Sequence, residues 1–266
     1  MISSWLDALD YSLCGGFIGV LIGLTGVGGA SLMTPLLVLL FGVHPATAVG
    51  TDLLYAAITK SAGSIVHSRH GNINWRIVGL LAAGSLPASL LTLWLVSSVD
   101  RSDLALIGGI TVALGALLIL TAILLLARPW LKRLVAPRLT AFVGERHEKR
   151  ILVLTWVLGL ILGTLVTITS VGAGAIGVTI LLLLYPRLPI HEVVGSDIAH
   201  AIPLTFVAGL GYWMIGEIDW MILGALLTGS IPGIIAGSHL APRLPEVYVR
   251  TLLAITLLIV GGKLIL

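Results

Sequence analysis

The stretch that decides the fold is Thr25-Gly-Val-Gly-Gly-Ala-Ser31, in the middle of an apolar segment that runs from Tyr11 to Phe41. This segment is longer than the roughly 20 residues that one helix needs to cross a bilayer. A second long apolar segment, Ile151–Leu184, is interrupted in the same way by Thr169-Ser-Val-Gly-Ala-Gly-Ala175. We therefore expect each segment to form a hairpin of two short helices that enters and leaves the membrane on one side.

The composition places the whole chain in a membrane. Of its 266 residues, 58% are hydrophobic and only 10% are charged, against roughly 25% charged in an ordinary soluble domain. This composition excludes a soluble enzyme, a nucleic-acid-binding domain and a disordered chain. The apolar runs are continuous, whereas strands of a membrane barrel alternate in polarity. We expect an all-α polytopic membrane protein with the lipid bilayer as its surroundings.

Short motifs recur in the same order in the two halves of the chain. Gly71-Asn-Ile-Asn-Trp75 recurs as Gly216-Glu-Ile-Asp-Trp220, an offset of 145 residues (216 minus 71). Two more pairs share this offset: Gly50-Thr-Asp52 with Gly195-Ser-Asp197, and Gly84-Ser-Leu-Pro87 with Gly229-Ser-Ile-Pro232. Internal repeats of this kind are typical of secondary transporters. Each repeat is expected to hold one glycine-broken hairpin followed by three transmembrane helices.

The charges predict how the repeats are oriented. The longest polar stretch, Arg128–Arg150, contains seven Lys and Arg residues. We therefore divide the chain into a first membrane repeat (1–127), a basic cytoplasmic linker (128–150) and a second membrane repeat (151–266). With two hairpins, twelve of the 15 basic residues lie on one side and one on the other; straight spans would give nine and four. The positive-inside rule favours the first arrangement, in which the two repeats are inverted.

The glycine breaks are the candidate binding site. The N-terminus of a half-helix carries free N–H groups and partial positive charge, which suits an anion. Two breaks related by inverted symmetry would meet near the midplane and hold one anion between them. Close helix packing, which glycine also permits, is the alternative. The candidate substrate-binding residues are Gly26, Gly28, Gly29, Ser31, Lys60, Ser170, Gly172 and Gly174.

A few charged or titratable residues lie inside apolar segments. Asp52 and Asp197 are expensive to bury in a membrane, so they indicate an ion or proton path, or else caps for free N–H groups of the hairpins. Lys60 would attract an anion, pair with Asp52 through a bend, or snorkel outward. His200 follows Asp197 by one helical turn and would relay protons or simply form a hydrogen bond. Asp52, Asp197 and His200 are therefore candidates for coupling or gating.

Other motifs have simpler interpretations. The four-residue spacing of Gly15, Gly19 and Gly23, and of Gly159 and Gly163, predicts close helix packing. No phosphate-binding loop or zinc motif occurs. We expect no catalytic residue, no metal and no cofactor.

The glycine breaks together with Gly50-Thr-Asp52 and Gly71-x-Ile-Asn-Trp75 resemble the TauE/SafE family of bacterial membrane proteins. The resemblance covers nearly the whole chain, about 12–266. It implies a multi-pass protein of the bacterial cytoplasmic membrane and transport of sulfite, a sulfonate or a related organosulfur anion. At the second break Ala173 separates Gly172 and Gly174, where the family often has a glycine pair.

These observations predict a secondary transporter of a small anion. Proton coupling, the direction of transport and a homo-oligomeric state stay open, and no nucleic-acid partner is expected. One alternative is a permease for a neutral or cationic solute that uses the two aspartates. A membrane-embedded enzyme or an assembly partner is a minor alternative.

Overall fold

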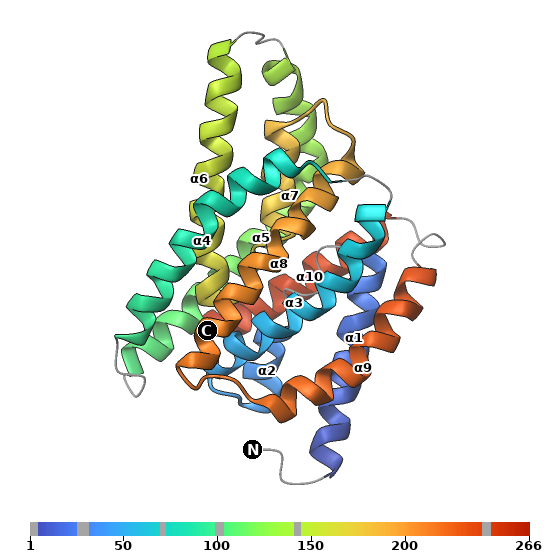
Figure 1. Ribbon diagram of the computed structural model, residues 1–266. Coiled ribbons are helices and arrows are strands. Elements are labelled where there is room, and N and C mark those ends of the chain that lie inside the picture. The colour runs from blue at the N-terminus through green and yellow to red at the C-terminus, as the bar shows by residue number, and fades with distance from the viewer. Residues whose placement is uncertain (1–4, 26–31, 70–72, 99–103, 141–144, 241–245) are drawn as a thin grey trace.

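The computed structural model describes residues 5–25, 32–69, 73–98, 104–140, 145–240 and 246–266, and these residues contain helices and no strand (Figure 1). The helices are, in order, α1 (Trp5–Thr25), α2 (Met33–Phe41), α3 (Pro45–Arg69), α4 (Trp75–Ser97), α5 (Leu104–Thr140), α6 (Glu145–Thr169), α7 (Ala175–Leu184), α8 (Ile190–Met214), α9 (Trp220–Leu240) and α10 (Glu246–Ile265).

Six helical stretches are long and apolar enough to cross a membrane within the described part of the chain. They lie in α4, α5, α6, α8, α9 and α10. The prediction of an all-helical, multi-pass protein is therefore confirmed.

Each long apolar segment forms one long and one short helix. The first arms, α1 and α6, have 21 and 25 residues, and the second arms, α2 and α7, have 9 and 10. The expectation of two short arms was therefore wrong for the first arm of each pair. The reason is that α1 and α6 begin at Trp5 and Glu145, several residues before the apolar segments, so polar turns lengthen them.

The basic stretch between the two halves is largely helical. Helix α5 has 37 residues and continues through Arg128 to Thr140, and α6 begins at Glu145. Hydropathy marks the end of an apolar run, but a helix ends only where its backbone hydrogen bonds stop. The stretch expected as a linker is therefore mostly an extension of two helices.

Helices of one half pack along helices of the other half. The most extensive packing joins α1 to α9 and α4 to α6, followed by α5 with α10 and α3 with α8. Figure 1 shows α1 and α9 side by side, although the one lies near the N-terminus and the other near the C-terminus.

The predicted glycine packing is confirmed at both of these helix pairs. A Cβ added to Gly15 would collide with the backbone carbonyl of Leu226 on α9, and one added to Gly159 with that of Leu81 on α4. One turn later, Gly19 meets Ser230 and Gly163 meets Ser85 in the same way. Leu226 and Ser230 lie 145 residues after Leu81 and Ser85, so the two contacts are equivalent under the offset of the repeat.

Candidate functional site

The intramembrane charges come together where α3 and α8 pack against each other. Asp52 and Lys60 lie on α3, and Asp197 and His200 lie on α8. Lys60 interacts electrostatically with both carboxylates and with His200. The four residues proposed for charge attraction and coupling are therefore neighbours. Gly26, Gly28, Gly29 and Ser31, proposed for the first break, lie outside the described residues.

Asp52 caps the first turn of α2. Its side chain is fully buried, and its Oδ2 accepts hydrogen bonds from the Thr34 hydroxyl (2.6 Å) and the Thr34 backbone N–H (3.2 Å). A carboxylate at a helix N-terminus satisfies free N–H groups and complements the helix dipole. The predicted capping role thus occurs at Asp52, while its Oδ1 atom has no hydrogen-bond partner.

Asp197 faces the first turn of α7 without forming a hydrogen bond of regular geometry. It is also fully buried, and neither carboxylate oxygen has a partner of regular hydrogen-bond geometry in the described part of the chain. The Oδ1 atom lies against Gly177, where a Cβ would collide with it. The backbone N–H of Gly174 donates to this carboxylate in a hydrogen bond of poor geometry.

The second break has the backbone that its glycines allow. Between α6 and α7, Gly172 and Gly174 have φ angles of 118° and 116°, a region that residues with a Cβ rarely adopt. Ser170 has a φ of 57° and a buried hydroxyl with no hydrogen-bond partner. This hydroxyl interacts with Asp52. The second break therefore lies beside the charged cluster, as a binding role requires.

Lys60 is close to the carboxylates but not bonded to them. Its side chain is partly buried, and among the described residues it forms no ion pair within 4.0 Å with Asp52 or Asp197. His200 is held by a hydrogen bond of 2.8 Å between its Nε2 and the hydroxyl of Ser85, and its Nδ1 has no partner. The cluster thus holds a cationic group and several polar atoms for which the described residues supply no regular hydrogen bond.

Sequence reasoning missed the residues that support this cluster from the opposite half. Ser85 on α4 contacts His200, and Ser230 on α9 lies beside Tyr55 on α3. Tyr55 and Ser85 precede His200 and Ser230 by 145 residues, so the two contacts are equivalent. The repeated Gly-Ser motif was the available signal, because it placed a serine at the equivalent position of both halves. It did not show which residue each serine contacts.

The rest of the Gly-Thr-Asp and Gly-Ser-Asp motifs fastens the turns before α4 and α9. The Thr51 hydroxyl accepts a hydrogen bond from the backbone N–H of Asp219 (3.1 Å), and the Ser196 hydroxyl accepts one from that of Asn74 (2.8 Å). At Gly50 the carbonyl oxygen of Glu217 approaches so closely that a Cβ would collide with it. Each motif thus combines a hydroxyl that accepts a hydrogen bond from the backbone of the other half with a buried carboxylate.

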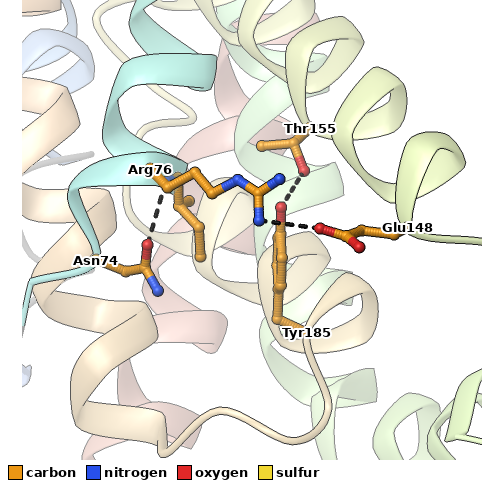
Figure 2. Close-up of polar contacts among 6 residues, drawn as sticks. Asn74, Arg76, Glu148, Thr155 and Tyr185 are labelled. Carbon is orange, nitrogen blue, oxygen red and sulfur yellow. Dashed lines mark hydrogen bonds and ion pairs between the residues drawn. The ribbon is translucent and has the colours of Figure 1, made fainter. Parts of the chain in front are cut away.

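The N-terminal end of α6 is tied to α4 and to the end of α7. Figure 2 shows the Arg76 guanidinium directed at Glu148, with a distance of 3.0 Å between Nη1 and Oε1. The Tyr185 hydroxyl, just after α7, lies 2.8 Å from that of Thr155 on α6. Asn74 caps α4 by accepting a hydrogen bond from the N–H of Ile77 (3.4 Å). The contacts of Glu148 and Tyr185 thus fix the two ends of the α6–α7 hairpin, one to α4 and the other to α6.

Comparisons with known proteins agree with this architecture. The sequence profile of the family described as "Sulfite exporter TauE/SafE" matches residues 11–264. The probable membrane transporter protein YjnA of Bacillus subtilis (strain 168) is 38% identical over 95% of this chain and 98% of its own length. The probable membrane transporter protein YdhB of the same organism is 29% identical over 92% of this chain and 94% of its own.

A probable membrane transporter protein of Xylella fastidiosa (strain Temecula1 / ATCC 700964) is 28% identical over 86% of this chain and 83% of its own. No solved structure matches the chain. Both the profile and YjnA cover almost the full length, and the helices are those of a multi-pass membrane protein. The chain therefore belongs to the TauE/SafE family of membrane transporters.

Proposed function

We propose that this chain is a secondary transporter that moves a small anion across the bacterial cytoplasmic membrane. Sulfite, a sulfonate or a related organosulfur anion is the proposed substrate. The observation that carries the proposal is the position of Lys60, a lysine inside the helical bundle with no contact ion pair to either neighbouring carboxylate. A cation buried in a membrane protein is costly unless it serves a ligand or a partner.

The binding site would lie between Lys60 and the second break. Ser170 supplies a buried hydroxyl beside Asp52, and Gly172 and Gly174 bring the start of α7 close to the cluster. Helix N-termini favour negative charge. The anion would then contact the Lys60 ammonium, the Ser170 hydroxyl and backbone N–H groups of the break.

The proposed transport cycle rests on two inverted repeats. The glycine contacts advance in the same direction along both partners, so α9 runs parallel to α1, and α6 runs parallel to α4. If the α1–α2 hairpin returns to the side of the membrane on which α1 begins, α3 runs in the same direction as α1. Helix α4 then runs opposite to α1. Helix α6 is then inverted relative to α1. One repeat rocking against the other would expose the site to each side in turn.

Asp52, Asp197 and His200 are the proposed coupling and gating groups. All three are buried, and each has at least one atom without a hydrogen-bond partner. Buried carboxylates and histidines are common members of proton paths in transporters. A proton gradient is therefore the first driving force to test.

The experiment is flux into proteoliposomes that contain the purified full chain. A panel of sulfur oxyanions, sulfonates and carboxylates is offered with and without a proton gradient. We expect uptake of at least one sulfur-containing anion and stimulation by the gradient. Absence of flux for every anion in the panel, in vesicles where the protein is folded, would refute the proposal.

A permease for a neutral or cationic solute is a second candidate. The observation in its favour is that both oxygens of Asp197 lack a partner, as expected for groups that receive a donor or a cation. In this case Asp52→Asn and Asp197→Asn would abolish substrate binding itself. For an anion transporter the same variants would change coupling while an anion without an N–H or O–H group, such as methanesulfonate, still binds.

A further inference from the structure

Asp197 differs from Asp52, the other carboxylate of the cluster, in what surrounds it. Its side chain is 0% exposed, and neither carboxylate oxygen accepts a hydrogen bond of regular geometry from the described residues. A buried acceptor left without a donor is strongly unfavourable, so the two oxygens are suited to receive a donor from a ligand.

The chain itself offers Asp197 little. Its interacting groups among the described residues are the Lys60 ammonium, which forms no ion pair with it within 4.0 Å, and the backbone N–H of Gly174, whose hydrogen bond to it has poor geometry. Asp52, by contrast, has hydrogen bonds from Thr34 and the hydroxyl of Ser170 beside it. Asp52 thus lacks a partner at one carboxylate oxygen and Asp197 at both.

A metal ion is a poor occupant for this position. No group of three or more His, Cys, Asp or Glu side chains that could hold a metal occurs among the described residues. Lys60 interacts with the same carboxylate and would repel a cation. An occupant that fits both groups presents negative atoms to Lys60 and an N–H or O–H group to Asp197.

We propose that Asp197 recognises a hydrogen-bond donor on the transported anion, so that the site selects small anions that carry an N–H or O–H group beside their anionic group. This inference rests on the proposed function. Anions with acceptors only would leave the Asp197 oxygens unsatisfied and would bind weakly, as in other sites built around a substrate N–H or O–H.

Sulfamate and methanesulfonate form a matched pair of probes. Both carry one negative charge on an –SO₃⁻ group, and they differ in an amino group against a methyl group of similar size. Binding of each is measured by calorimetry to the purified full chain in detergent. We expect sulfamate to bind at least tenfold more tightly than methanesulfonate. Equal affinities would overturn the inference while leaving the proposed function intact.

Substitution then assigns the preference to one residue. In Asp197→Ala the ratio of the two affinities should fall to about one, mainly through weaker binding of sulfamate. Asp10→Ala, which removes an exposed aspartate of α1, is the control and should keep the ratio of the native protein. A tenfold preference that survives in folded Asp197→Ala would show that Asp197 is not the acceptor.

Two further outcomes remain decisive. If Asp197→Ala does not fold, Asp197→Asn replaces it, and the ratio should still fall because one acceptor becomes a donor. If neither anion binds the native protein, the proposed anion site fails, and this inference fails with it.

Discussion

Asp52 and Asp197 occupy the same position in the two halves of the chain and have different surroundings. Both are buried and face the start of a short helix, α2 or α7. Asp52 receives two hydrogen bonds from Thr34, whereas Asp197 receives none of regular geometry from the described residues. Thr179, which lies 145 residues after Thr34, donates its hydroxyl to the carbonyl oxygen of Ala175 instead.

The difference separates two uses of one carboxylate. The carboxylate of Asp52 has a structural role, since it accepts a hydrogen bond from a backbone N–H group that would otherwise be buried without a partner. The carboxylate of Asp197 caps no helix in this way, and the charged group that interacts with it is the Lys60 ammonium. Because the equivalent of Lys60 is Thr205, the second half has no lysine at this position. The helix contacts of the two halves are thus repeated, whereas the cluster around Lys60 and Asp197 is not.

The largest expected effect tests whether the equivalent contacts α1–α9 and α4–α6 contribute equally to stability. Gly15→Ala and Gly159→Ala each place a Cβ on a backbone carbonyl of the partner helix. We expect both to lower the free energy of unfolding by a similar amount, about 3 kcal/mol, measured by denaturant unfolding in detergent. Gly79→Ala is the control, because nothing lies within 4 Å of its added Cβ. Strongly unequal losses at Gly15 and Gly159 would break the comparison.

The second prediction separates the two aspartates by stability. Asp52→Ala leaves the buried N–H of Thr34 without its acceptor, so the free energy of unfolding should fall by roughly 1–3 kcal/mol. Asp197→Ala removes a carboxylate without partners and should leave stability unchanged or higher. The same unfolding measurement on both variants decides the matter. Equal losses would mean that the missing hydrogen bonds at Asp197 have no energetic consequence.

The third prediction concerns the lysine that only one half contains. Lys60→Ala should weaken binding of the anion at least tenfold, about 1.4 kcal/mol, because the buried positive charge is lost. Thr205→Val, at the equivalent position, removes a hydroxyl that bonds only to carbonyl groups of its own helix. This variant should keep the native affinity in calorimetry. A loss at Thr205 as large as that at Lys60 would contradict the asymmetry.

The smallest expected effect concerns the helix caps. Asp219 accepts hydrogen bonds of 3.0 Å from the N–H groups of Met221 and Ile222, whereas Asn74 accepts one of 3.4 Å from Ile77. Asp219→Ala should therefore lower the free energy of unfolding by about 1 kcal/mol. Asp219→Asn keeps an acceptor and should lose less, as thermal unfolding would show. An unchanged midpoint in Asp219→Ala would show that the cap is dispensable.

The sequence predicted the parts of this molecule that follow from local patterns. Long apolar runs required helices, and the spacing of Gly15 and Gly19 required a close partner. Asp52, Lys60 and Asp197 stood out because charges are rare in apolar segments. Their meeting in one cluster followed from nothing local, since it depends on how α3 packs on α8.

What the sequence did not predict depends on partners that are distant in the chain. Ser85 contacts His200, 115 residues away, and no periodicity indicates such a pair. The contrast between Asp52 and Asp197 was equally hidden, because it turns on which way two threonine hydroxyls point. The extent of α5 was missed because hydropathy reports apolar character and not hydrogen bonding.

The pairing of α1 with α9 has a consequence for how the chain is made. Helix α1 leaves the ribosome first, but the backbone that receives its glycine face belongs to α9, which is synthesised some 200 residues later. Throughout this delay Gly15, Gly19 and Gly23 face lipid, or whatever insertion factor holds the nascent chain. Helix α6 meets α4 as soon as it is inserted, because its partner is already in the membrane. During synthesis the contact between α4 and α6 is therefore expected to form before the contact between α1 and α9. An arrested chain that lacks α9 should be a substrate for membrane quality-control proteases.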